Sequence, residues 1–281
     1  MRKLALLLVV LAVCAPAPSA GVSIRDIQYT TDPAGASPLN GAAVNCTGGV
    51  VTMKFEGTKP RVVVQDPSQP GEWGAIQVKD FTVGAAFFHS VAIGDFVSVS
   101  NVTVNEAWGT TMLQYGYLGQ ASGFAIVSQG NALPAALVVA PADIRAPVEG
   151  PPGYFLVGDH AAEKYESMLL EVRDVTIPMS GGMDLGKAQD NYVLRNGSGD
   201  CWASDYMNPL KPSYLDYTPG VVPGAHFDAM RGILEQYVAT GYDYYQLLTV
   251  PEPGGPAILA LAAIALLPRR GARREGPRER A

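Results

Sequence analysis

The stretch from Phe96 to Glu106 reads FVSVSNVTVNE, and it decides the fold of this chain. Apolar and polar residues alternate along it, which places the apolar side chains on one face of a β-strand. A Gly94-Asp95 turn leads into the stretch. After Trp108-Gly109, the residues from Thr110 to Leu118 supply the next strand. The pattern predicts strands with one buried face rather than helices.

Upstream of this stretch, further strands complete the set that a small barrel needs. Ala42 to Met53 is rich in β-branched residues and is interrupted by Gly48-Gly49. A glycine inside a strand marks a bulge or a sharp bend, and a long, bent first strand can pass from one layer of a small barrel to the other. Two more strands are predicted at Arg61 to Asp66 and Gly74 to Asp80, and a short helix or irregular crossover at Phe81 to Ile93.

The second half of the chain repeats this plan. Tyr165 to Ile177 parallels the long first strand. Further strands follow in the same order at Asn191 to Asn196, Asp200 to Asp205, Gly224 to Tyr237 and Tyr242 to Thr249. Helical periodicity is nearly absent, so we predict an all-β chain that contains two small barrels in tandem.

The segment between the two sets of strands holds an extended run and then the proline-rich APVEGPPG. Proline cannot join the interior of a sheet, so this proline-rich part is predicted to separate the two units. The expected organisation is a first domain at residues 21–119, a connecting strand and proline-rich linker at 120–163, and a second domain at 164–249.

Both ends of the chain carry targeting patterns. Arg2 and Lys3 precede an apolar run and then small residues up to Ala20, which is typical of a secretory signal peptide over residues 1–20. Residues 250–281 combine a turn rich in proline and glycine, a short apolar run and a basic stop. The residues that mark this tail are Val250, Pro251, Glu252, Pro253, Arg269 and Arg270. Because arginines prefer the cytoplasmic side of a membrane, the body is expected outside the inner membrane.

This tail resembles the PEP-CTERM sorting signal of Gram-negative bacteria. The resemblance implies a C-terminal sorting helix and processing by an exosortase-type transpeptidase, besides the signal peptidase that the N-terminus requires. It also implies that the tail anchors the protein in the inner membrane before processing. The processed protein is then expected at the cell surface or in the extracellular matrix.

A second resemblance covers roughly Ser23 to Val250. The segments SPLNG, VVQD, VSVSNVTVNE and GTTML of the first unit, and EKYESMLLEV of the second, are similar to the tandem OB-fold-like region of secreted bacterial endonucleases. The resemblance implies two OB-fold-like barrels. Only the sorting tail follows the second unit in this sequence, so the catalytic domain of those nucleases has no counterpart, and only a non-catalytic role is implied.

The charge of the body limits the choice of ligand. Residues 1–20 hold two of the 20 basic residues, and residues 251–281 hold six basic and three of the 26 acidic residues. The body therefore keeps 12 basic and 23 acidic residues, a formal net charge of −11. This balance repels a phosphate backbone and disfavours nucleic acid. A local groove near the one dense basic group could still bind it: Lys54, Lys59, Arg61 and Lys79.

Residues with catalytic or metal-binding chemistry are sparse. His89, His160 and His226 stand alone, without a second histidine at helical spacing. No nucleophile elbow or phosphate-binding loop is present, so no catalytic residue, metal site or cofactor is predicted. Export would permit a disulfide between Cys46 and Cys201, but disulfide geometry is strict, and two buried thiols are expected instead.

Aromatic and polar side chains on the second and third strands of each barrel are the best binding candidates, since OB-folds bind ligands there. They are Gln65, Trp73, Gln77 and Lys79 in the first unit, and Tyr192, Arg195 and Trp202 in the second. The leading expectation is a non-enzymatic exported binding protein for polysaccharide or protein. The alternatives are a nucleic-acid-binding protein that acts either alone or with a separate extracellular nuclease, and a hydrolase whose site comes from distant strands.

Overall fold

The computed structural model of the chain describes residues 21–183, 185, 190–206, 208 and 217–249. Strands dominate it, and the predicted all-β class is confirmed. The predicted signal peptide and the predicted sorting tail lie outside the described residues. Within those ranges, no helix is long and apolar enough to cross a membrane.

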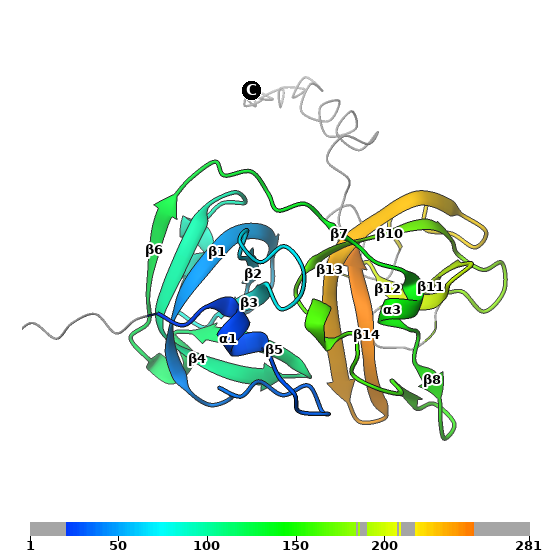
Figure 1. Cartoon of the computed structure of the whole chain (residues 1–281), viewed down its shortest axis with the longest axis horizontal. Helices are drawn as coiled ribbons and strands as arrows, with labels where there is room; N and C mark the ends of the chain where they lie inside the picture. The colour runs from blue at the N-terminus through cyan, green and yellow to red at the C-terminus, as the bar shows by residue number, and fades with distance from the viewer. Residues whose placement is uncertain (1–20, 184, 186–189, 207, 209–216, 250–281) are drawn as a thin grey trace, which may run out of the picture.

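The first barrel is formed by five strands in the first half of the chain (Figure 1). They are β1 (Ala43–Phe55), β2 (Arg61–Gln65), β3 (Ala75–Asp80), β4 (Phe96–Ala107) and β5 (Thr110–Tyr115). They pair in the order β1-β2-β3-β5-β4, and β4 pairs with β1 to close the barrel. Only the β3–β5 pair of this closed path is parallel. Five strands in this Greek-key order form an OB-fold.

A glycine bulge in β1 allows the barrel to close. The N-terminal part of β1 pairs with β4, and its C-terminal part pairs with β2. The register of the β1–β4 pair shifts twice, between Val44 and Cys46 and between Cys46 and Gly49. Gly48 has a φ of +83°, and a Cβ atom there would lie 1.6 Å from the carbonyl oxygen of Val97. Only glycine tolerates both conditions. The bend predicted from the Gly48-Gly49 pair is therefore present.

The second barrel repeats the first in strand order. Its strands are β10 (Leu169–Thr176), β11 (Asn191–Asn196), β12 (Gly199–Ser204), β13 (His226–Ala239) and β14 (Tyr242–Thr249). They pair as β12-β11-β10-β13-β14, and a parallel β12–β14 pair closes the circle as β3–β5 does in the first barrel. The second unit is therefore also an OB-fold, which confirms the tandem arrangement.

Short helical elements accompany these strands. They are α1 (Ile24–Gln28), α2 (Ala86–Ser90), α3 (Pro141–Ile144), and the 3-10 turns η1 (Tyr117–Gly119) and η2 (Glu163–Tyr165). The helix α2 lies between β3 and β4, inside the range where a short helix or crossover was predicted.

The segment at 120–163, where a connecting strand and a proline-rich linker were predicted, holds four short strands that pair with the two barrels. Its strand β6 (Gly123–Ser128) extends the first sheet beside β4, whereas β7 (Leu137–Val138) pairs with β10. The prolines belong to a hairpin of β8 (Val148–Glu149) and β9 (Phe155–Leu156), and β9 pairs with β14. The proline-rich part therefore sits on the second barrel and does not separate the units, because its prolines occupy an exposed hairpin turn. Residues 129–136 make the crossing (Figure 1).

The two barrels have separate interiors and share a packed interface. Met53, Phe55 and Val63 of the first barrel form a buried cluster with Ile233 and Leu248 of the second. Cys46 lies in the core of the first barrel and Cys201 in that of the second. Both thiols are free and buried, as expected from the sequence.

Candidate ligand-binding groove

Four of the seven predicted binding residues are buried, and they cannot serve as a binding platform. Gln65 and Gln77 are 0% exposed, Tyr192 is 0% exposed and Trp202 is 3% exposed. Gln65 accepts a hydrogen bond from the Leu169 amide across the barrel interface. Tyr192 belongs to the core of the second barrel, and Phe155 covers Trp202 with its ring centroid 5.2 Å away.

The other three predicted residues lie apart from one another. Trp73 occupies the β2–β3 turn and meets the ring of Tyr29 edge to face at 5.7 Å. Arg195 is exposed and forms an ion pair with Asp200 at 2.6 Å. Lys79 is half-buried at the end of β3, and it lines a cavity between the two barrels.

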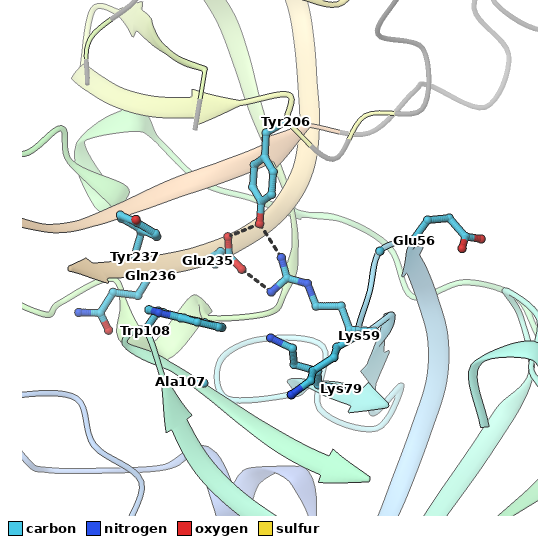
Figure 2. A pocket seen from close by; sticks show the side chains of 11 residues that line it. Glu56, Lys59, Lys79, Ala107, Trp108, Tyr206, Glu235, Gln236 and Tyr237 are labelled. Atoms are coloured by element: carbon cyan, nitrogen blue, oxygen red, sulfur yellow. Dashed lines mark hydrogen bonds and ion pairs between the residues drawn. The ribbon is translucent and has the colours of Figure 1, made fainter. Parts of the chain in front are cut away.

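This cavity, the inter-barrel groove, has a volume of about 430 Å³ (Figure 2). It opens where the β1–β2 loop and the β4–β5 turn of the first barrel meet β13 of the second. Its lining residues are Glu56, Gly57, Lys59, Arg61, Lys79, Ala107, Trp108, Tyr206, Glu235, Gln236 and Tyr237. In an OB-fold, the face of strands two and three and the loops 1–2 and 4–5 form the ligand site, and the groove occupies the end of that face.

The base of the groove is a buried ion pair between the barrels. Arg61 donates hydrogen bonds to Glu235 at 2.6 Å, to Tyr206 at 2.6 Å and to Gln77 at 2.7 Å. Burial lowers the pKa of Arg61, but the Glu235 carboxylate and Tyr206 outweigh this effect, so its pKa is raised. The charge of Arg61 is thus matched within the protein, and this residue serves the interface more than a ligand.

Lys59 and Lys79 are the two groove cations whose charge could bind an anionic ligand. The Nζ atom of Lys59 lies 4.1 Å from the ring centroid of Phe81, and that of Lys79 lies 4.5 Å from the ring centroid of Trp108. Among the described residues, no carboxylate is within ion-pair distance of either ammonium group. Burial, Arg61 and Lys59 lower the pKa of Lys79. An anion in the groove would therefore relieve repulsion among these cations.

Lys54, the fourth member of the basic group, points elsewhere. Its ammonium donates to the carbonyl oxygens of Phe88 and Val91 and lies over the Phe88 ring. The structure thus brings together three of the four cations that the sequence grouped.

Trp108 supplies the exposed ring of the groove, and its side chain is 61% exposed. It occupies the β4–β5 turn with a φ of +56°, followed by Gly109 at +88°, as a two-residue hairpin turn requires. The Val238 amide donates to the Trp108 carbonyl oxygen at 2.7 Å, so the second barrel fixes this turn. Trp108 was not predicted as a site residue. Its place in a short Trp-Gly turn was the available signal, because a side chain in such a turn lies at the surface of the barrel. Tyr206 and Tyr237 were also missed.

A second polar cluster lies in the interface, away from the groove. Glu166 accepts from the Thr111 amide at 2.9 Å, and Glu163 accepts from the Tyr245 hydroxyl at 2.7 Å. Burial, together with the nearby Glu106 and Asp243, raises the pKa of Glu163 to about 8 despite the bond from Tyr245. Burial and Glu163 also raise the pKa of Glu166. In the described part of the chain, no group of three or more histidines, cysteines or carboxylates could hold a metal ion.

Strand order defines both units as OB-folds. No family model and no curated protein matches the chain. It is similar to an OB domain from Methanosarcina mazei, with 17% identity over 32% of this chain and 76% of that one and a TM-score of 0.23.

Two larger solved structures are also similar to the chain. A murine DNA-binding protein with double-stranded DNA has 11% identity over 71% of this chain and 91% of that one, with a TM-score of 0.31. A Replication Protein A heterotrimer bound to single-stranded DNA has 10% identity over 80% of this chain and 69% of that one, with a TM-score of 0.24. Because these TM-scores are low, the OB assignment rests on strand order.

Proposed function

We propose that the chain is a non-enzymatic binding protein whose inter-barrel groove binds single-stranded nucleic acid. The observation that carries this proposal is the placement of Lys59 and Lys79 beside the exposed ring of Trp108. Lysine ammonium groups attract phosphates, and a tryptophan ring offers a stacking surface for any base. The binding of polysaccharide or protein, which the sequence favoured, becomes the second candidate.

The acidic body limits the affinity. Two lysines can neutralise about two phosphates, and stacking on one ring contributes about 1–3 kcal/mol. We therefore expect a dissociation constant above about 10 μM at physiological salt. The logarithm of the association constant should fall with the logarithm of the salt concentration with a slope of about −1.4.

Fluorescence anisotropy with a labelled oligothymidylate over a salt series tests the proposal. The double variant Lys59→Ala/Lys79→Ala should lose most of the affinity and of the salt dependence. Arg195→Ala is the matched control, since Arg195 is an exposed cation on the second barrel and its ion pair with Asp200 is local. Equal binding by the double variant and the wild type would refute the role of the groove.

A neutral glycan has one specific feature in its favour. Tyr29 and Trp73 present two rings in edge-to-face contact, with Arg25 5.2 Å from the Tyr29 centroid, away from the groove lysines. A sugar ring can stack there without any phosphate contact. Binding on a glycan array that Trp73→Ala abolishes, together with no oligonucleotide binding, would establish this second candidate.

The proposed location is outside the inner membrane, with a tail that anchors the chain before an exosortase-type transpeptidase processes it. The resemblance of residues 250–281 to a sorting signal supports this part of the proposal. Cell fractionation is the test, and recovery of the protein with cytoplasmic markers would contradict it.

A further inference from the structure

An aromatic ledge continues the groove along the first barrel. Phe81 follows β3 and Tyr117 follows β5, and their rings meet edge to face at 5.2 Å. The parallel pairing of β3 and β5 brings these two strand ends together, and the Phe81 amide donates to the Tyr115 carbonyl oxygen at 2.8 Å. Both rings are half-buried. The ledge, Phe81 and Tyr117, thus has a fixed backbone.

The groove lysines lie between the ledge and Trp108. Lys79 Nζ is 4.5 Å from the Trp108 centroid and 6.0 Å from the Phe81 centroid. Lys59 Nζ lies 4.1 Å from the same Phe81 ring. The surface therefore alternates ring, cation and ring. Each ammonium rests on a ring face, where a cation is attracted by the electrons of the ring.

We propose that the groove and the ledge form one track for at least two consecutive nucleotides of a single strand. One base stacks on Trp108, the next stacks on the Phe81–Tyr117 ledge, and Lys59 and Lys79 bind the phosphate between them. This inference rests on the proposed function and specifies its ligand. Binding requires the lysines to leave the ring faces, so that the bases take their places.

Bases and phosphates alternate along a single strand of nucleic acid, and this order matches the alternation of rings and cations on the protein better than other ligands do. A nucleic acid carries one anion between successive rings, whereas a neutral glycan carries rings without anions. In a duplex, the bases are already stacked and paired, so their faces are not free for Trp108 or Phe81. The track therefore selects single strands over duplexes and over neutral glycans.

Labelled thymidine mononucleotide, trithymidylate and a short duplex test the track in the full-length protein. The wild type should bind trithymidylate at least about fivefold more tightly than the mononucleotide, since a second base adds one stacking contact. Phe81→Leu, which keeps an apolar side chain without a ring, should reduce this gain to less than about twofold, since the second stacking contact is lost. Trp108→Ala should weaken both. Tyr154→Ala, an exposed aromatic on the second barrel, is the control.

The outcomes separate the track from the proposed function. Binding of trithymidylate that Phe81→Leu and Phe81→Ala leave unchanged would refute the ledge while the groove proposal survives. Duplex binding equal to single-strand binding would also refute the track. If neither the mononucleotide nor trithymidylate binds the folded wild type, the groove proposal and the track both fail.

Discussion

At the scale of single residues, Arg61 and Glu235 determine how the barrels meet. Their side chains are 10% and 7% exposed, and their ion pair spans 2.6 Å between the barrels. Removal of one partner leaves the other charge buried and unmatched, which commonly costs about 3–5 kcal/mol.

We therefore expect Glu235→Gln to lower the free energy of unfolding by about 3 kcal/mol, measured by urea denaturation. The double variant Arg61→Met/Glu235→Leu should recover much of this loss, because no unmatched charge remains. If Glu235→Gln is as stable as the wild type, the pair does not hold the interface.

The outcome for the predicted site residues shows which binding residues the sequence could identify and which it could not. The strand pattern marks β2 and β3 as the ligand-binding face of an OB-fold, and Gln65 and Gln77 were predicted as binding residues on that basis. This pattern carries no information about a second barrel that covers that face. Lys79 and the group of Lys59 and Arg61 were found because their charge is visible in the sequence.

At the scale of secondary-structure elements, the long strands were predictable and the short ones were not. Phe96 to Glu106 was predicted and β4 spans Phe96–Ala107, because alternation is a local property of a strand. The strands β7, β8 and β9 have two residues each, too few for any period. Their pairing depends on the second barrel, so the sequence indicated only a connecting strand and a proline-rich linker in their place.

The glycine bulge of β1 leads to a prediction about the stability of the first barrel. Gly48→Ala should lower the free energy of unfolding by at least about 3 kcal/mol, in the upper range for single substitutions, because its Cβ would meet the Val97 carbonyl oxygen. Gly71→Ala is the control, since its Cβ meets no atom within 4 Å and its φ is not positive. Thermal unfolding measures both. Equal stability of the two variants would show that β1 closes the barrel without this bulge.

At the scale of the whole molecule, the buried cluster of Glu163 and Glu166 in the interface makes the stability of the fold depend on pH. The pKa of Glu163 is about 8 in the folded protein against an ordinary value of 4.5. Between these values the folded state holds a proton that the unfolded state has released. The associated stability is therefore full below pH 4.5 and is lost as the pH rises towards 8.

Urea denaturation at several pH values between about 5 and 8 should show this decline. Glu163→Gln should make the decline shallower, because the amide keeps an oxygen for the Tyr245 hydroxyl and does not titrate, whereas the buried Glu166 still does. Glu149→Gln, on the exposed β8–β9 hairpin, should leave the profile unchanged. A decline that persists unaltered in Glu163→Gln would assign the effect to other groups.

The β8–β9 hairpin has a consequence for the architecture of the chain. The first barrel docks through the outer face of β2 and β3, and in the second barrel the matching strands are β11 and β12. The hairpin covers that matching face, since Phe155 packs on Trp202. Contacts between unlike faces of successive repeats can add further copies without limit. By covering this face, the hairpin removes from the second barrel the surface that corresponds to the docking surface of the first.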